Sequence, residues 1–224
     1  MHQHVAIIFD MDGVLVDSNP FHKIALRQFC RQHGHELSEQ QLREKIYGRT
    51  NRDWLTNLFG KLAEEQLLAF ANEKEALFRE VYKRDIVALK GLRTFLDLLD
   101  RYQIPRAIAT SAPRANVDFT LSKTGLEKYF SVILDDTFVS RGKPDPEIYI
   151  KTAAALGLPN EQCIVLEDSI SGVVAGKRAG SKVIGITTTH SAGELTNTDY
   201  VITDFEGWDP QVLISKINLT PQTS

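Results

Sequence analysis

The sequence predicts an α/β fold, in which a doubly wound parallel sheet carries a small inserted helical cap domain. Short runs rich in valine and isoleucine recur along the chain, as in strands that are buried on both faces. Stretches with helical patterns separate most of these runs, which is the alternation typical of such sheets. One long segment, roughly residues 18–85, has helical patterns but no convincing strand.

Composition and charge limit the function classes. The chain has 224 residues, a length that suits one large domain or a medium domain with a small second one. A net charge of −3 gives no reason to expect a nucleic acid or an acidic membrane as partner. Apolar runs are too short to span a membrane or to form a signal peptide, and Cys30 and Cys163 lack a metal or redox spacing. We therefore expect a cytoplasmic protein with reduced thiols.

The first predicted strand, residues 5–9 with the sequence "VAIIF", runs directly into Asp10 and Asp12. Because an unpaired buried carboxylate is costly, this pair should lie at an open strand end, near a cation, or both. Alternate residues of an extended chain face the same side, and Gly13 then lets the backbone turn away. The two carboxylates can hold Mg²⁺, or one can attack while the other transfers a proton. A turn or capping aspartate is the simpler alternative.

The helical segment follows this strand immediately. Its four helical patterns are "HKIALRQFCRQHG", "SEQQLREKIYG", "DWLTNLFGKL" and "EEQLLAFANEKEALFREVYKR". An insertion is the economical interpretation, which gives a core of residues 1–17 and 86–224 and a helical cap of residues 18–85. Ligands of doubly wound sheets bind at the carboxyl ends of the strands, so we expect an insert that leaves from there to act as a lid.

The rest of the chain supplies the other elements of the predicted sheet. A helix is predicted at "GLRTFLDLLDRY", because one face carries Leu92, Phe95, Leu96 and Leu99. Two more helices, "DPEIYIKTAAALGL" and "ISGVVAGKRAG", end at or near glycine. The further strands are "IPRAIAT", "FSVIL", "CIVLE", "KVIGIT" and "YVITDF".

Polar residues with catalytic potential follow several of these strands. Thr110 and Ser111 have hydroxyl groups suited to phosphate oxygens, although such residues often cap helices. Glu167 and Asp168 end another buried run, where a cation would explain them, although Asp168 could cap the next helix. Lys143 lies in a loop restrained by prolines, although most lysines are solvated. With the acids after the first strand, these groups suit phosphoryl transfer with Mg²⁺.

Four segments together resemble the successive motifs of the haloacid dehalogenase superfamily, in order and spacing over nearly the whole chain. They are "FDMDGVLVDS", "ATSAP", "GKPDPEIY" and "LEDSISGVVAGKRAG". The helical insert resembles the small cap of the β-phosphoglucomutase-like branch. This resemblance implies a Rossmann-like core, a mobile helical cap and a monomer.

The resemblance also implies roles for the core residues. Asp10 would be the nucleophile that becomes an aspartyl phosphate, and Asp12 the general acid and base. Mg²⁺ would be held by Asp10, the backbone carbonyl of Asp12 and Asp168, with Glu167 nearby. The groups that hold the phosphate would be Thr110, the Ser111 backbone and Lys143. A dehalogenase needs neither Mg²⁺ nor an acid two residues after its nucleophile, so Asp12 favours phosphoryl transfer.

The resemblance extends to three residues of the insert. His22 stands at the spacing of a substrate-gating histidine, Gly48 matches a hinge glycine and Lys74 matches a cap lysine. Two of these residues have a simpler alternative. His22 would then be a partly buried helix histidine, and Lys74 a solvated helix lysine. His22 and Lys74, together with Arg49, which follows Gly48, favour a phosphorylated sugar as substrate.

The chain departs from the mutase pattern at two places. Asn51 replaces the arginine that the mutase uses for the substrate phosphate, and Arg49 and Arg52, which flank it, are candidates for that role or simple surface charges. Arg114 and Asn116 stand where the mutase has a Lys-Asn pair, and they are candidates for contact with a distal phosphate or with hydroxyl groups.

The predicted function is a Mg²⁺-dependent phosphatase of small sugar phosphates, with a hexose phosphate as the expected substrate. The alternative is a β-phosphoglucomutase that interconverts β-glucose 1-phosphate and glucose 6-phosphate. Hydrolysis is favoured because of the displaced arginine and the changed Lys-Asn pair. A non-catalytic, receiver-like module that accepts phosphate is less favoured, since it needs neither Asp12 nor a lid.

Overall fold

The structure is a computed structural model that describes residues 5–46 and 51–217, the side chain of Arg43 excepted. The chain divides into two compact units. We call Met1–Asp17 with Ile86–Ser224 the core unit and Ser18–Asp85 the helical unit.

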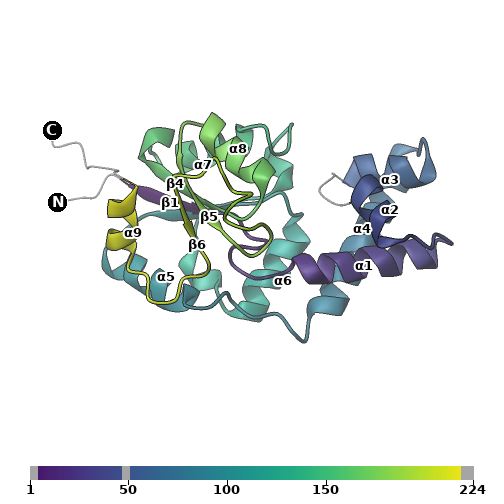
Figure 1. Cartoon of the computed structure of the whole chain (residues 1–224), viewed down its shortest axis with the longest axis horizontal. Helices are drawn as coiled ribbons and strands as arrows, with labels where there is room; N and C mark the ends of the chain where they lie inside the picture. Colours follow the sequence, from purple (N-terminus) through teal and green to yellow (C-terminus); the bar gives the residue numbers. More distant parts are fainter. Residues whose placement is uncertain (1–4, 47–50, 218–224) are drawn as a thin grey trace. The chain divides into compact units, whose positions relative to one another are not determined.

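The core unit contains a six-stranded parallel sheet with the strand order β3-β2-β1-β4-β5-β6 (Figure 1). This arrangement confirms the predicted doubly wound fold, and each of the six predicted runs contributes one strand. The strands are β1 Ala6–Phe9, β2 Arg106–Ala109, β3 Ile133–Leu134, β4 Cys163–Glu167, β5 Lys182–Ile186 and β6 Tyr200–Ile202.

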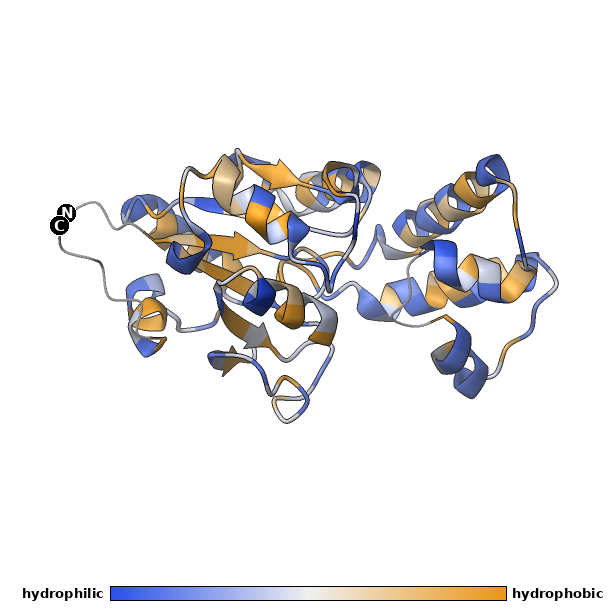
Figure 2. Cartoon of the chain, turned by 90° about the horizontal axis from the view of Figure 1, so that it is seen from above, coloured by the Kyte–Doolittle hydropathy of each residue, from blue (hydrophilic) through white to orange (hydrophobic). Residues whose placement is uncertain are grey.

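Alternate residues of the strands pack against helices on opposite faces of the sheet. On β1, Ile7 and Phe9 join one core cluster, whereas Ala6 and Ile8 join the other. Phe9 lies at the centre of the first cluster, with its ring 5.7 Å from that of Phe130. The strands are accordingly the most hydrophobic part of the core unit in Figure 2. Burial on both faces explains why these runs lack a polar alternation in the sequence.

Five helices of the core unit cover the sheet. They are α5 Leu92–Arg101, α6 Arg114–Thr124, α7 Glu147–Ala155, α8 Ile170–Arg178 and α9 Pro210–Lys216. Helices α5, α7 and α8 were predicted, and α6 and α9 were not. The buried side of α6 includes polar residues such as Asn116 and Thr120, which weaken its amphipathic pattern. Helix α9 has a readable start, because Asp209 caps it and Pro210 follows.

The helical unit confirms the four predicted helices. They are α1 Asn19–Gln32, α2 Glu39–Lys45, α3 Asn51–Phe59 and α4 Glu64–Tyr82. Ser38 starts α2 with a capping box, in which its side chain accepts from the Gln41 amide. The core of this unit includes Phe29 and Trp54, whose rings lie 5.5 Å apart. Within the described part of the chain, every helix is too short or too polar to cross a membrane.

Gly91 fixes the start of α5 and provides a test of the fold. Its φ is +76°, and a Cβ there would lie 2.3 Å from the backbone carbonyl carbon of Phe205. Gly157 has a similar φ of +72°, but nothing lies within 4 Å of its Cβ position. We expect Gly91→Ala to lower the free energy of unfolding by about 3 kcal/mol or more, because it adds a backbone clash to the strain. Gly157→Ala should lose only about 1–2 kcal/mol. Urea titrations that give equal losses would contradict this account.

Candidate active site

The strand order places the polar residues at the carboxyl ends of β1 and β4 side by side. These strands are neighbours, with Phe9 opposite Leu166, and the Asp10 amide donates to the Leu166 carbonyl at 3.0 Å. Strand numbering reverses direction between β1 and β4, which is the point where doubly wound sheets bind ligands. Asp10 and Glu167 therefore leave the sheet together, at the edge that the sequence predicted.

Lys143 joins the acids that follow these two strands. Its ammonium donates to Asp10 Oδ1 at 2.6 Å and to Glu167 Oε1 at 2.7 Å, with a longer contact of 3.3 Å to the Ala109 carbonyl. Its side chain is only 7% exposed, so the alternative of a solvated surface lysine is wrong. Burial strengthens these ion pairs, because water screens them little.

Glu167 is fully buried and its carboxylate is saturated with donors. Oε1 accepts from the Lys143 ammonium and the Tyr149 hydroxyl, each at 2.7 Å. Oε2 accepts from the Asp168 amide and from the amide and hydroxyl of Ser169, each at 3.0 Å. Burial favours the neutral acid, but Lys143 and the other donors outweigh it and hold the pKa of Glu167 below its usual value. The charged carboxylate is thus held in one orientation.

The glycine at position 172 makes room for this carboxylate. A Cβ there would lie 1.7 Å from Glu167 Oε1, so a larger residue would displace the acid. Neither Tyr149 nor Gly172 was predicted to belong to the site. Their contribution is visible only when α7 and α8 are packed against the sheet.

Asp168 is 3% exposed and accepts a hydrogen bond from the hydroxyl of Thr189, a residue that sequence reasoning missed. Burial raises the pKa of Asp168 to about 7, and the charge of Glu167 adds to this effect. The helix-cap alternative for Asp168 is wrong, because the hydroxyl of Ser169 caps α8 by accepting from the Gly172 amide at 3.0 Å.

The acids of this edge fit a divalent cation. Ligand oxygens of Asp10, Glu167 and Asp168 lie within 4.8 Å of one another, and all three residues are buried. Burial, with Glu167 and Asp168 nearby, raises the pKa of Asp10 well above its usual value despite Lys143. A Cβ on Gly13 would lie 1.9 Å from Asp168 Oδ2, so this glycine is also needed beside the cluster. Three buried carboxylates, two of them bound to one ammonium, are an oxygen-rich, negatively charged set of the kind that Mg²⁺ binds.

Asp12, Thr110 and Ser111 follow strands at the same edge of the sheet. Asp12 is half-buried in the turn after β1, and its charge contributes to the raised pKa of Asp168. Thr110 is buried after β2, and its hydroxyl accepts from the Ala112 amide at 3.0 Å. Ser111 is exposed. Pro113 occupies the N-cap position of α6 and the helix has no side-chain cap, so the helix-cap alternatives for Thr110 and Ser111 are wrong.

The candidate contacts on α6 differ from each other. Arg114 is exposed and forms an ion pair with Asp118 at 2.8 Å. Asn116 is only 1% exposed. Of the two, Arg114 has the side chain that a ligand in solution can reach.

Two predicted residues of the helical unit lie on α1 and α4. The His22 ring is half-buried and stacks on Phe78, with 3.6 Å between the ring centroids. Lys74 is 5% exposed and its ammonium pairs with Glu75, so the alternative of a solvated lysine is wrong. The Lys74 charge is thus balanced within the helical unit.

Asn51, which stands where the mutase pattern has an arginine, forms two hydrogen bonds within the helical unit. Asn51 donates to Glu75 Oε1 at 3.3 Å and accepts from the Trp54 indole at 2.9 Å. Arg52 is exposed and pairs with Glu64 at 2.6 Å. The two other predicted residues of this loop, Gly48 and Arg49, lie outside the described residues.

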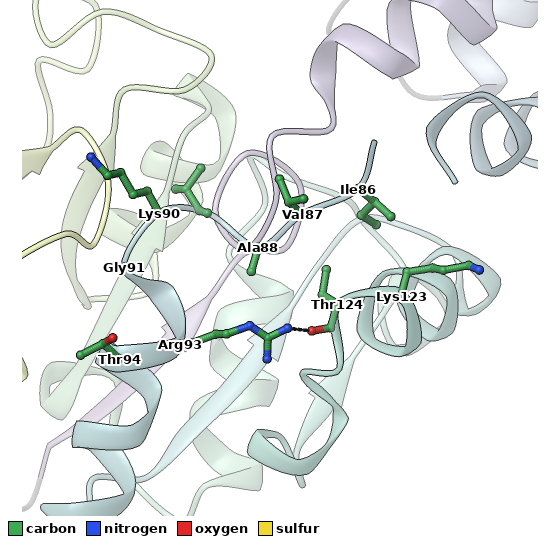
Figure 3. Close-up of a pocket in the computed structure, with 10 residues that line it drawn as sticks. Ile86, Val87, Ala88, Lys90, Gly91, Arg93, Thr94, Lys123 and Thr124 are labelled. Carbon is green, nitrogen blue, oxygen red and sulfur yellow. Dashed lines mark hydrogen bonds between the residues drawn. The ribbon is translucent and has the colours of Figure 1, made fainter. Parts of the chain in front are cut away.

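A cavity of about 420 Å³ lies elsewhere in the core unit, between the segment before α5 and the end of α6 (Figure 3). The Arg93 guanidinium crosses it to donate to the Thr124 carbonyl. None of the residues of the acidic cluster lines this cavity. The cavity is therefore separate from the candidate active site.

Known proteins are similar to this chain in both sequence and fold. Residues 7–186 match the family model described as haloacid dehalogenase-like hydrolase. A phosphorylated carbohydrates phosphatase from Thermotoga maritima is 35% identical over 195 residues, which cover 84% of this chain and 88% of the relative. A β-phosphoglucomutase from Bacillus subtilis is 28% identical, over 81% of this chain and 82% of that enzyme.

A solved structure agrees with these sequence relatives. The crystal structure of a family IA, variant 3 hydrolase of the same superfamily, from Entamoeba histolytica, superposes with a TM-score of 0.88 at 31% identity. The match covers 95% of this chain and 99% of that chain. The chain therefore belongs to the haloacid dehalogenase-like hydrolase family, as an enzyme of its phosphohydrolase or phosphomutase type.

Proposed function

We propose that the chain is a Mg²⁺-dependent phosphatase that hydrolyses small sugar phosphates, hexose phosphates foremost, through an aspartyl phosphate on Asp10. The observation that carries this proposal is the buried cluster of Asp10, Glu167 and Asp168, with Lys143 bound to two of its members. Anionic phosphate oxygens need positive charge at the place where the nucleophile attacks. Lys143 supplies such a charge within 2.6 Å of Asp10.

In the first half-reaction, an Asp10 carboxylate oxygen forms a bond to phosphorus while the bond from phosphorus to the sugar oxygen breaks. Asp12 donates its proton to that leaving oxygen. Lys143, Thr110 and the Ser111 backbone hold the phosphoryl oxygens. A bound Mg²⁺, held by Asp10, the Asp12 carbonyl and Asp168 beside Glu167, would neutralise negative charge on the phosphoryl group.

In the second half-reaction, a water molecule forms a bond to phosphorus and the bond to Asp10 breaks. Asp12, now a carboxylate, takes the proton from this water. The products are inorganic phosphate and the free enzyme. Since Asp10 must be ionised to attack, the burial that raises its pKa has to be opposed by positive charge.

The sugar preference rests on the relatives and on the helical unit. A relative named for phosphorylated carbohydrates supports a small sugar phosphate as substrate. We assign the helical unit as the cap and His22 and Lys74 as its candidate substrate-binding residues, with Arg114 of the core unit as a further candidate. Gly48 and Arg49, predicted for the same role, lie outside the described residues. A monomer and a cytoplasmic location remain predictions.

Hydrolysis is favoured over the mutase alternative. A phosphoglucomutase must bind a second phosphate. The mutases that this chain resembles use an arginine for this purpose, at the place where this chain has Asn51. Asn51 has no charge, and it already bonds to Glu75 and Trp54. The evidence for the mutase alternative is the similarity to a β-phosphoglucomutase. The receiver-like alternative has no counterpart among these relatives.

The mechanism predicts distinct losses for the two aspartates. Asp10→Asn should abolish turnover of sugar phosphates, because no phosphoryl group can be accepted. Asp12→Ala should lower kcat by roughly 10²- to 10⁴-fold, the usual contribution of a general acid and base. Phosphate release is the measurement, and Asp53→Asn, an exposed aspartate of α3, is the control. Turnover retained by Asp10→Asn would rule out this mechanism.

One incubation separates a phosphatase from a mutase. We expect Mg²⁺, β-glucose 1-phosphate and a trace of glucose 1,6-bisphosphate to yield inorganic phosphate with this protein. Coupled assays would follow phosphate and glucose 6-phosphate in the same sample. Glucose 6-phosphate without phosphate release would instead establish the mutase alternative. If neither product forms, glucose phosphates are excluded and other sugar phosphates follow.

The buried acids also predict how pH acts on the metal-free protein. Asp168 ionises near its ordinary value of 3.8 when unfolded but near 7 when folded, so the folded state retains the proton longer. In EDTA, Asp168 should therefore contribute most to the free energy of unfolding below about pH 4. This contribution of Asp168 should be lost as the pH rises to about 7.

Urea titrations between pH 4.5 and 7.5 measure this effect. Asp168→Asn should show a smaller decrease in stability with pH than the wild-type protein. Mg²⁺ should bind more tightly at the higher pH, because its ligands must first lose their protons. Identical pH slopes for the variant and the wild type would show that Asp168 is not the group responsible.

A further inference from the structure

Tyr149 touches the charged pair of the candidate site with both parts of its side chain. It lies on α7 and is fully buried. Its hydroxyl donates to Glu167 Oε1 at 2.7 Å, and the Lys143 Nζ lies 4.9 Å from the centroid of its ring. Sequence reasoning assigned no role to this residue. One side chain thus contacts both the acid and the ammonium.

The two contacts act on the same ammonium. Glu167 Oε1 accepts from Lys143 and from Tyr149, so the phenol fixes the oxygen to which the ammonium is bound. The ring face carries partial negative charge and attracts the ammonium at this distance. Lys143 is therefore held by Asp10, by Glu167, by the aromatic ring and, at a longer distance, by the Ala109 carbonyl. A shift of Glu167 would move the lysine away from Asp10.

We propose that Tyr149 is a positioning residue, which holds Glu167 and Lys143 so that the ammonium stays beside the nucleophile Asp10 and the phosphoryl group. This inference rests on the proposed function, because it takes Lys143 to be a phosphate-binding group. Tyr149 does not touch the substrate. It acts through Glu167 by its hydroxyl and on Lys143 by its ring.

A purely structural role would involve only the ring. Tyr149 packs in the core cluster that includes Ile148 and Ala153, and phenylalanine would fill the same space. Only the hydroxyl distinguishes the two roles. Tyr129 provides a matched control, because it is also buried in the core unit and its hydroxyl also donates to a carboxylate, Asp97 Oδ1, at 2.6 Å.

The test compares Tyr149→Phe with Tyr129→Phe in the full chain. For hydrolysis of a sugar phosphate with saturating Mg²⁺, Tyr149→Phe should lower kcat by about tenfold or more, the effect of losing one hydrogen bond to a charged group. The KM should rise by a smaller factor than kcat falls, because the contacts to the sugar are unchanged and Lys143 is needed most where charge develops in the transition state. Tyr129→Phe should keep the wild-type kcat.

The second readout is the ¹⁵N NMR signal of the lysine ammonium groups, which does not depend on turnover. Burial and hydrogen bonding should make the Lys143 ammonium visible, and Lys143→Met identifies its resonance. Tyr149→Phe should shift and broaden this resonance, whereas Tyr129→Phe should leave it unchanged. An unchanged Lys143 resonance in Tyr149→Phe would overturn the inference, as would a shifted resonance with wild-type kcat.

The two readouts separate this inference from the proposed function. If the wild-type protein hydrolyses no sugar phosphate, the proposed function fails, and the Lys143 resonance alone decides whether Tyr149 positions the ammonium. If Tyr149→Phe does not fold, a nuclear Overhauser effect in the wild-type protein between the Lys143 ammonium and the Tyr149 ring protons decides it. Absence of that effect overturns the inference, and its presence supports it.

Discussion

The Lys143 ammonium, held between Asp10 and Glu167, is the interaction on which the arrangement of the candidate site depends. Like charges at short distance repel, and burial raises the cost of each. Lys143 offsets part of that cost and fixes the distance between the acid after β1 and the acid at the end of β4. Without it, the sheet edge would hold carboxylates that only protons or a metal ion could neutralise.

The parallel sheet explains how residues so distant in sequence reach this ammonium. Asp10 and Lys143 are 133 positions apart, but they follow β1 and β3, which both pair in parallel with β2, so the segments after these strands open onto one edge. Each segment contributes a few polar residues, whose positions are set by the buried strands that precede them. Two glycines complete the arrangement, because Gly13 and Gly172 leave the space that Asp168 and Glu167 occupy. The site is thus a property of the whole sheet and of no single loop.

The sequence allowed the fold to be predicted because buried parallel strands leave an unmistakable pattern of β-branched residues. Helix α6 escaped because Asn116 and Thr120 lie on its buried side. The acids and Lys143 were predictable as strand-end residues, since position along the chain sets the edge on which they lie. Tyr149 and Thr189 were not, because their contacts with Glu167 and Asp168 arise from the packing of distant segments. The pairs Lys74–Glu75 and Asn51–Trp54 are local in the sequence, but the burial of Lys74 and Trp54 follows only from the packing of the helical unit.

Burial gives the acidic cluster two opposed properties, and the charges around it decide which one prevails. A desolvated carboxylate is a more reactive nucleophile, but the same desolvation favours its protonated, unreactive form. At Asp10, burial and the neighbouring acids raise the pKa, and Lys143 opposes them only in part, so the pKa stays above its usual value. Glu167 stays ionised because five donors surround it, so it fixes Lys143 while adding to the negative charge. A divalent cation would tip the balance at Asp10 and Asp168 toward the ionised forms, so the cation and the reactive nucleophile would be present together.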